Sequence, residues 1–482
     1  MEKNEILINF INRELIEVPN SINNELTKNN QKLNIRKEFG EIKSNIDDFL
    51  EGYASKRFIV MPGLRGVGKT TLIYQIYEYL LKEKNIPLSN ILYISFDEIN
   101  NMVETNIKET VEIYLESKFN ASLRTLSQNV FIFIDECQYD HNWAESGKII
   151  YDKTKKIFMI FSGSSALHLE YNADAARRIK KRPLTPLNYA EHIKLKYNLD
   201  CTEMSESIKE LIFTGKYENA MESESRTYAK LSNIPEYYFN DWDLYLKYGG
   251  FPILLDKKDP QETIEELINV TEKIINHDMM TIKNMSLNNQ TLANRILRFL
   301  ATQQAGTVSQ NNLANYFDTA IGNINTILNI LEKTHLIFHC EPYGSPSARA
   351  KKPWKYYFAT SSIKNALSTS IGNTINNLAE YEGILIENQI ASNLFNLSNK
   401  EFSQISTYYD PNSRNNVDFL IQENFRAPIP IEVGRGSKKI RQMKYAINSY
   451  NSDYGIIISN KTDAIEKKGD ILFVPVKTFT FL

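Results

Sequence analysis

Cysteine is scarce in this chain. The 482 residues include only three cysteines, Cys137, Cys201 and Cys340, and these lie far apart. Without a closely spaced pattern they give no basis for a disulfide framework. This usage is typical of proteins kept in a reducing environment, so we expect a cytoplasmic protein.

Long apolar runs are also lacking. No stretch of about 18 uninterrupted apolar residues occurs. The first residues, Met1-Glu-Lys-Asn-Glu-Ile-Leu, lack the basic segment and long apolar core of a secretory leader. We therefore expect neither a membrane span nor a membrane partner.

The chain carries no large excess of either charge. Its formal net charge is −2 with 24% charged residues. Contact with nucleic acid would therefore depend on local basic patches. A hydrophobic content of 42%, with 27 Tyr and 24 Phe, is ample for packed cores and excludes a disordered chain. This length is expected to hold about three domains.

The most specific motif present is a glycine-rich loop. The sequence Gly63-x-x-x-x-Gly68-Lys69-Thr70 follows an apolar segment, 57–62, and precedes a helical pattern. In such a loop the glycines turn backbone N–H groups toward phosphates, the lysine adds a mobile positive charge, and the threonine hydroxyl can bind Mg²⁺. The motif predicts ATP as the ligand, held by Gly63, Gly66, Gly68, Lys69, Thr70 and Thr71.

A second motif supplies the acids that such a loop needs. The apolar run from Val130 ends in the adjacent carboxylates Asp135 and Glu136, as expected of a Walker B strand buried on both faces. Asp135, together with Thr70, would hold the Mg²⁺, and Glu136 would orient or deprotonate the attacking water. The two motifs together predict an ATPase that uses ATP and Mg²⁺.

Strands and helices alternate around these motifs, which predicts an α/β fold with a parallel sheet of the P-loop NTPase type. Ligands of such sheets sit at the carboxyl ends of the strands, where Asp97 and Ser162–Ser165 also fall. The expected strands are 57–62, 90–96, 130–135, 157–162 and 182–184, and the expected helices are 69–84, 104–124 and 142–154.

The remaining chain is expected to form four further parts. Residues 1–50 should be an N-terminal helical segment beside the ATPase core, 51–190. Residues 191–288 read as a helical lid or insertion, in which the acidic run after Met221 could be flexible. Residues 289–362 follow the helix-helix-helix-strand-strand order of a winged helix. Residues 375–482 return to alternating helices and strands.

With these motifs laid out, the chain resembles prokaryotic AAA+-type ATPases that join a P-loop domain and a winged helix to a C-terminal PD-(D/E)xK nuclease-like domain. The resemblance extends over nearly the whole length. Its motifs are Gly63–Thr71, Asp135–Gln138, Ser162–Ser165, Arg178 before Pro186-Leu-Asn-Tyr-Ala-Glu191, and Tyr248–Pro252.

By this resemblance, Ser162 would be a sensor of the γ-phosphate and Arg178 an arginine finger acting on a neighbouring subunit, which implies a homo-oligomer. Alternatives stay open at both positions. Ser162 could simply cap the next helix. Arg177 and Arg182 rival Arg178, and the whole basic run could be a solvated surface.

The resemblance also implies a second metal site in the C-terminal domain, formed by Glu387, Asp418 and Glu432. Here the chain departs from the family's active pattern, because Gly434 occupies the position of the expected lysine. The nearest cations are Arg435, Lys438 and Lys439. An active nuclease with a displaced lysine and a degenerate domain that only holds nucleic acid are both consistent with the sequence.

The predicted wing carries basic residues interleaved with aromatics, Arg349-Ala-Lys-Lys-Pro-Trp-Lys-Tyr-Tyr357. Such a hairpin could contact phosphates without reading sequence, although winged helices also bind proteins. The pattern around His335, His339 and Cys340 favours packing over a metal site.

The sequence as a whole predicts an ATPase that couples Mg-ATP hydrolysis to nucleic-acid binding, with DNA as the first expectation. Two alternatives remain: an ATP/ADP switch that gates a protein partner, and an ATP-dependent nuclease of a defence or mobile-element system.

Overall fold

The computed structural model describes residues 3–163, 177–257, 259–279, 286–303, 307–372, 377–400, 404–412, 415–434 and 440–482. These residues form two compact units. The first unit contains the chain as far as Thr185, together with the described residues 276–279. The second contains Pro186–Ile275 and the chain from residue 286 onward. Each unit is described by itself.

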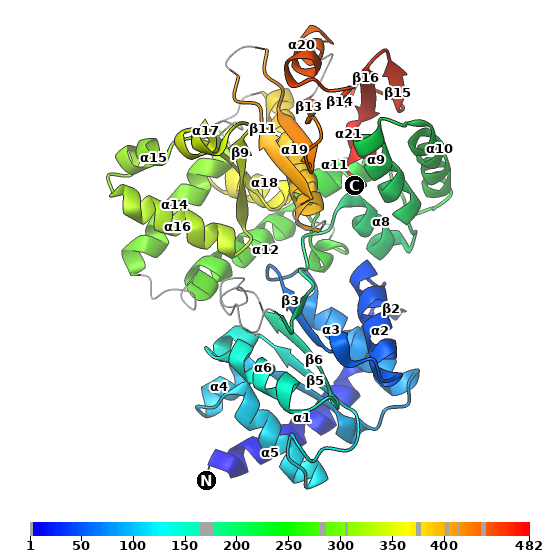
Figure 1. The fold of residues 1–482 in the computed structure, drawn as a ribbon, viewed down its shortest axis with the longest axis vertical. Coiled ribbons are helices and arrows are strands. Elements are labelled where there is room, and N and C mark those ends of the chain that lie inside the picture. The colour runs from blue at the N-terminus through cyan, green and yellow to red at the C-terminus, as the bar shows by residue number, and fades with distance from the viewer. Residues whose placement is uncertain are drawn as a thin grey trace. The chain divides into compact units, whose positions relative to one another are not determined.

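A parallel five-stranded sheet is the centre of the first unit (Figure 1). Its described strands lie in the order β4-β5-β6-β3-β7, and every neighbouring pair runs parallel. The elements of this unit are α1 (Lys3–Glu25), β1 (Thr27–Lys28), β2 (Gln31–Lys32), α2 (Lys37–Leu50), β3 (Phe58–Pro62), α3 (Lys69–Lys82), β4 (Ile91–Ser95), α4 (Phe96–Met102), α5 (Ile107–Phe119), β5 (Val130–Asp135), α6 (Trp143–Lys153), β6 (Ile157–Gly163) and β7 (Lys180–Lys181).

Helices cover both faces of this sheet, which explains why its strands are continuous apolar runs. On one face, side chains of α1, α5 and α6 form a single cluster with alternate residues of the strands. On the other face, Tyr77 of α3 packs edge-on against Phe133, and Phe49 of α2 against Phe131. The first four predicted strands and the helices that become α3 and α6 are confirmed to within a few residues, whereas the fifth strand lies at Lys180–Lys181, α5 ends at Phe119, and α4 was not predicted. The N-terminal segment differs slightly, because a short β1–β2 hairpin separates its two helices.

The second unit contains a mixed sheet of nine described strands in the order β15-β16-β14-β13-β12-β11-β9-β10-β8. Its elements are α8 (Tyr189–Tyr197), α9 (Thr202–Thr214), α10 (Glu218–Ser232), α11 (Asp241–Tyr248), α12 (Pro260–Lys273), α14 (Leu287–Thr302), β8 (Thr307–Val308), α15 (Gln310–Tyr316), α16 (Ile321–Lys333), β9 (Ile337–Pro342), α17 (Pro346–Lys351), β10 (Trp354–Phe358), α18 (Ser361–Ser370), α19 (Leu378–Lys400), β11 (Ile405–Tyr409), β12 (Phe419–Glu423), β13 (Ile429–Gly434), α20 (Ile440–Tyr450), β14 (Gly455–Ser459), β15 (Glu466–Lys468), β16 (Ile471–Pro475) and α21 (Val476–Phe479).

The strands of the predicted wing belong to the same sheet as the strands of the predicted C-terminal domain. β9 pairs antiparallel with β10 on one side and parallel with β11 on the other. The β9–β11 junction places Tyr408 beside Glu341 and Tyr409 beside Pro342, and Tyr343 N–H donates to the Tyr409 carbonyl at 3.0 Å. The sequence-based boundary between residues 362 and 375 therefore lies within a region joined by backbone hydrogen bonds.

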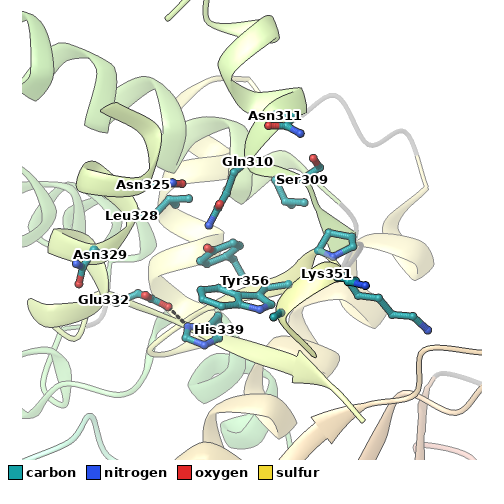
Figure 2. A pocket seen from close by; sticks show the side chains of 15 residues that line it. Ser309, Gln310, Asn311, Asn325, Leu328, Asn329, Glu332, His339, Lys351 and Tyr356 are labelled. Carbon is teal, nitrogen blue, oxygen red and sulfur yellow. Dashed lines mark hydrogen bonds and ion pairs between the residues drawn. The ribbon is translucent and has the colours of Figure 1, made fainter. Parts of the chain in front are cut away.

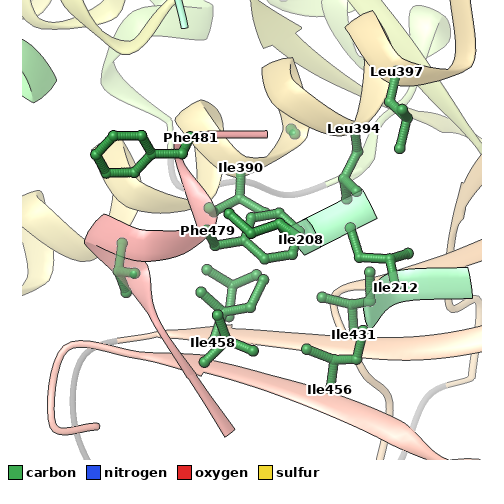
Figure 3. Packing of buried hydrophobic residues seen from close by; sticks show 14 of the residues in the cluster. Ile208, Ile212, Ile390, Leu394, Leu397, Ile431, Ile456, Ile458, Phe479 and Phe481 are labelled. Carbon is green, nitrogen blue, oxygen red and sulfur yellow. The ribbon is translucent and has the colours of Figure 1, made fainter. Parts of the chain in front are cut away.

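The helical region after Pro186 shares a core with the C-terminal strands. Figure 3 shows Ile208 and Ile212 of α9 beside Ile390 of α19 and Ile458 of β14. All of these side chains are fully buried. Residues 191–275 therefore pack as part of the second unit's core, although the sequence pattern describes them only as a lid or insertion.

The acidic run after Met221 is ordered, so the expectation of a flexible insertion is wrong. It lies in helix α10 and contributes a buried carboxylate. Glu224 accepts hydrogen bonds from the Ile465 N–H, at 2.9 Å, and from the Thr478 hydroxyl. These bonds satisfy the carboxylate inside the unit, where an unpaired charge would be strongly unfavourable. Among the described residues, no helix combines the length and apolarity needed to cross a bilayer.

Candidate functional site

The glycine-rich loop leads from β3 directly into helix α3. Gly66 and Gly68 have φ values of 80° and 91°, which residues with a Cβ atom rarely adopt. Gly63 is required for a different reason, since a Cβ there would lie 2.4 Å from the Leu184 carbonyl oxygen. Lys69 is buried, and its ammonium donates to the carbonyls of Gly63 at 2.9 Å and Leu64 at 3.0 Å. The loop thus holds a cation beside the free N–H groups of a helix start.

Asp135, at the end of β5, is the centre of a hydrogen-bond network across three strands. The Thr70 hydroxyl donates to its Oδ2 at 2.5 Å, and the Ser162 hydroxyl donates to its Oδ1. The Tyr93 hydroxyl of β4 lies 3.3 Å from Oδ2. A carboxylate and hydroxyls are ligands that Mg²⁺ prefers. The donor set around Asp135 therefore fits Mg²⁺, with Thr70 and Asp135 as the residues that would hold it.

Glu136 follows Asp135 in an unusual backbone conformation. Its φ is 50°, in the left-handed region that costs a residue with a side chain about 1 kcal/mol or more. Its carboxylate accepts a hydrogen bond from the Gln138 amide. Burial raises the pKa of Glu136 above its ordinary value of 4.5, while the nearby positive charges of Lys69 and Arg65 oppose that increase. A strained acid with a raised pKa beside the loop is a reasonable general base.

Two arginines tie the glycine-rich loop to other parts of the first unit, and sequence reasoning missed both contacts. Arg36, just before α2, donates to the Val67 carbonyl at 2.7 Å and pairs with Glu38 at 3.2 Å. Arg65 within the loop pairs with Asp278, which is 2% exposed, at 2.9 Å. No local pattern marks Arg36 or Asp278, because each acts on a residue far away in the sequence.

The structure places Ser162 as expected and Arg178 away from its own chain's loop. Ser162 lies on β6, which separates β3 from β5 in the sheet. Arg178 pairs with Asp152 at 2.8 Å, near the end of α6. Because α6 returns from the end of β5 to the start of β6, Asp152 lies at the amino edge of the sheet, opposite the glycine-rich loop. Among its rivals, Arg182 pairs with Glu41 and Arg177 is exposed.

In the second unit, the predicted acids do not all come together. Burial of Glu387 on α19, together with the nearby charge of Asp418, raises the pKa of Glu387 to about 7. Asp418 accepts from the Val433 N–H at 2.7 Å. Glu432 has the Gln442 amide 3.4 Å away. Within the described ranges, no group of three or more His, Cys, Asp or Glu residues is placed to bind a metal ion.

A lysine does reach these acids, but from an element that the sequence assigned to another domain. Lys355 of β10 lies 3.9 Å from Glu387, and Tyr357 of the same strand donates to Glu387 at 3.0 Å. Lys355 is nearly buried, with 11% of its side chain exposed. It is therefore not available as a phosphate contact of the wing, and that sequence expectation is wrong. Arg435, Lys438 and Lys439 lie outside the described residues.

The remaining basic residues of the wing differ in exposure. Lys351 and Lys352 are exposed. Arg349 instead stacks over Tyr408, with 4.3 Å between its guanidinium carbon and the ring centroid, and donates to the Gly344 carbonyl. His339 stacks on Trp354 with 3.9 Å between ring centroids. This contact agrees with the packing role expected for His339.

Comparisons with known proteins place the chain in a family. Residues 55–193 match the AAA domain, and residues 239–375 match a domain of unknown function, DUF8612. The uncharacterized protein MJ1637 of Methanocaldococcus jannaschii is 31% identical over 448 residues, which cover 93% of this chain and 89% of that protein. The chain thus has an AAA domain of the P-loop class. It belongs to the family of MJ1637.

Other similarities are weaker. The uncharacterized protein MJ1544 of the same organism is 24% identical over 289 residues, covering 58% of this chain and 55% of that protein. The structure of the Aeropyrum pernix ORC1 protein in complex with DNA has a TM-score of 0.33 at 11% identity and covers 72% of this chain and 96% of that one. The structure of C. elegans PCH-2 has a TM-score of 0.26 at 14% identity and covers 65% and 72%, respectively.

Proposed function

We propose that this protein hydrolyses ATP in the presence of Mg²⁺ and that the nucleotide cycle controls its binding to nucleic acid. The network centred on Asp135 supports the first part. It joins the loop residue Thr70, the Walker B strand and Ser162 through hydrogen bonds to one carboxylate. Loss of a phosphate or of the metal at this point would alter all three elements together.

Each residue of the site has a role in this proposal. The Lys69 ammonium, now bonded to two carbonyls of its own loop, would exchange those bonds for phosphate oxygens. Thr70 and Asp135 would hold Mg²⁺, which supplies charge neutralisation when bound. Glu136 would take the proton of the attacking water. Arg178 would act in the site of a second copy, since its own loop lies at the opposite edge of the sheet.

The nucleic-acid part rests on residues 287–358 of the second unit. Helices α14, α15 and α16 are followed by the β9–β10 hairpin, with β8 pairing with β10. This is the element order of a winged helix. Lys351 and Lys352 lie exposed on the segment between the two strands of the hairpin. Their contacts with phosphates would be independent of sequence and sensitive to salt.

The group around Glu387 supports a second candidate, metal-dependent cleavage of nucleic acid. Asp418 and Glu387 form an acidic pair, and Lys355 supplies the cation that position 434 lacks. The observation against it is that the described residues contain no group of three or more such side chains placed to bind a metal ion, and a domain that only holds nucleic acid is the alternative. Plasmid nicking with Mg²⁺ or Mn²⁺, lost in Asp418→Ala, would establish cleavage.

One experiment tests the main proposal. ATP turnover by the full chain is measured alone and with double-stranded DNA, single-stranded DNA or RNA, beside the variants Lys69→Ala and Lys108→Ala. Lys69→Ala should lose ATP binding, because the phosphate charge stays uncompensated. Lys108 pairs with Glu112 on the surface of α5, so Lys108→Ala should behave as the parent. If none of the nucleic acids changes the rate of ATP turnover, the result would favour a switch that gates a protein partner.

A further inference from the structure

A cavity of about 710 Å³ lies between α16 and the β9–β10 hairpin. Figure 2 shows Gln310 and Asn325, from two helices, on one side of it, and Glu332 with His339 on another. Lys351 extends away at the margin (Figure 2). The lining combines amides, aromatic rings and cations: Gln310, Asn311, Asn325, Asn329, His339, Lys351, Lys352, Trp354 and Tyr356.

The aromatic part of the lining is held by stacking and hydrogen bonds. His339 and Trp354 are stacked with their ring planes 10° apart. His339 is fixed in turn by a hydrogen bond to Glu332, and the Trp354 backbone pairs with Val308 of β8. Flat, fixed aromatic surfaces of this kind are stacking platforms for nucleobases, because every base has a π face.

The polar part of the lining matches the edges of a base. Asn325 and Asn329 are exposed on one face of α16, so their amides are accessible from the cavity. A side-chain amide both donates and accepts, which allows it to pair with the donor and acceptor edges of different bases. Lys351 and Lys352 lie at the margin, where a phosphate attached to a base in the cavity would be neutralised.

We propose that this cavity binds an unpaired nucleotide of a nucleic-acid strand, with its base against the Trp354 ring and its phosphate near Lys351 and Lys352. A base inside a duplex has both faces covered by its neighbours, so only a single-stranded or extruded base can reach a recessed ring. The two adjacent lysines favour a strand over a lone nucleotide, because they can follow successive phosphates.

This inference rests on the proposed nucleic-acid binding, and the test separates the two. Binding of a fluorescent 12-nucleotide single strand to the full chain is compared with binding of the same length carrying abasic sites and of a duplex. Trp354→Ala should weaken binding of the natural single strand roughly tenfold, the usual effect of losing one stacking platform, and leave the abasic strand and the duplex unchanged. Trp354→Phe should retain most of the affinity.

The backbone of Trp354 pairs with β8, so replacing its side chain also affects packing in the sheet. A second variant therefore changes an exposed residue of α16 instead. Asn325→Ala removes one of the amides that line the cavity, at an exposed position of α16, and it should weaken binding of the natural single strand alone. Phe425→Ala removes a fully exposed aromatic ring outside the cavity and serves as the control. Binding should not change in this variant.

Each other outcome has a defined meaning. Equal binding of natural and abasic strands, or equal losses of single strand and duplex in Trp354→Ala, would overturn the base pocket while leaving nucleic-acid binding intact. Absence of binding by every nucleic acid would overturn the proposed function itself. Full competition by a mononucleotide, measured in Lys69→Ala so that the glycine-rich loop cannot take it up, would overturn the assignment to a strand.

Discussion

Arg65 of the glycine-rich loop and Asp278 form a two-pronged ion pair. Arg65 Nε lies 3.1 Å from Oδ1 of Asp278, and Nη2 lies 2.9 Å from the same oxygen. Asp278 ends the π-helical turn Ile274–Asp278, which directly follows α12. Although α12 belongs to the second unit, Asp278 belongs to the first. The chain therefore runs from α12 of the second unit directly into the residue that pairs with the nucleotide loop.

Breaking this pair should destabilise the first unit. Asp278→Ala leaves the guanidinium without its carboxylate, and we expect a loss of about 2 kcal/mol in the free energy of unfolding, typical of hydrogen bonds to charged groups. A double-mutant cycle with Arg65→Ala, followed by urea denaturation, isolates the pair. A coupling energy near zero would show that the two residues stabilise the protein independently.

Glu136→Gln should bind ATP and turn it over at least about 100-fold more slowly, because an amide cannot accept the proton. Turnover of the parent should fall as the pH decreases through the raised pKa of Glu136, since protonation removes the base. Nucleotide titration and phosphate release, each as a function of pH, check both points. Parent-like turnover by Glu136→Gln would exclude the base role.

Arg178→Ala should lower turnover without weakening ATP binding, and specific activity should rise with protein concentration. Asp152→Ala is the matched control, because it removes the same ion pair within the chain but keeps the arginine. If both variants lose activity equally, Arg178 acts through the ion pair. Full activity of a monomer at every concentration, measured with light scattering, would also contradict a role in trans.

Replacing Lys351 and Lys352 together by Ala should weaken binding of all nucleic-acid sequences and reduce the slope of log K against log salt by about 2. Lys355→Ala should leave the slope unchanged, since Lys355 faces Glu387. Filter binding at several salt concentrations measures both slopes. An unchanged slope in the double variant would indicate that this hairpin contacts protein.

The acidic pair in the second unit predicts a pH dependence of stability. The pKa of Glu387, about 7 in the folded state, lies above its ordinary value of 4.5, so the folded protein binds this proton more tightly than the unfolded chain. The free energy of unfolding should therefore fall by about 1–3 kcal/mol as the pH rises between these values. Urea denaturation at several pH values measures this change in the free energy of unfolding.

Two variants test the cause. Glu387→Gln should remove most of this dependence. Asp418→Asn should reduce the pH dependence. At pH 8 this variant should be at least as stable as the parent, because the charge that repels Glu387 is gone. If the stability of Glu387→Gln still depends on pH as strongly as that of the parent, another group is responsible for the dependence.

The sequence predicted the first unit well because each of its signals is local. The apolar strands, the glycine-rich loop and the acids after β5 are contiguous motifs, and the carboxyl ends of parallel strands bring them together in the way that the alternation of elements predicts. The contacts of Arg36, Tyr93 and Asp278 depend on tertiary structure, so no local pattern could indicate them.

The second unit shows where a linear pattern is insufficient. The order of helices and strands in residues 289–362 and the return to both after residue 375 were predicted, but the pairing of the strands was not. The pattern of Lys355 is that of a wing cation, whereas strand pairing turns its side chain toward Glu387. In the same way, the acidic composition around Glu224 predicts solvent exposure, and only the packing of α10 against the C-terminal strands shows that it is buried.

The parallel pairing of β9 with β11 limits where proteins of this family can be cut into separately folding fragments. A fragment that ended near residue 375, where the DUF8612 match ends, would leave the outer edge of β9 without its partner. Exposed strand edges recruit other chains and promote aggregation. Insolubility of such a fragment would thus reflect a missing strand, and recombination in evolution should retain or lose the whole sheet together.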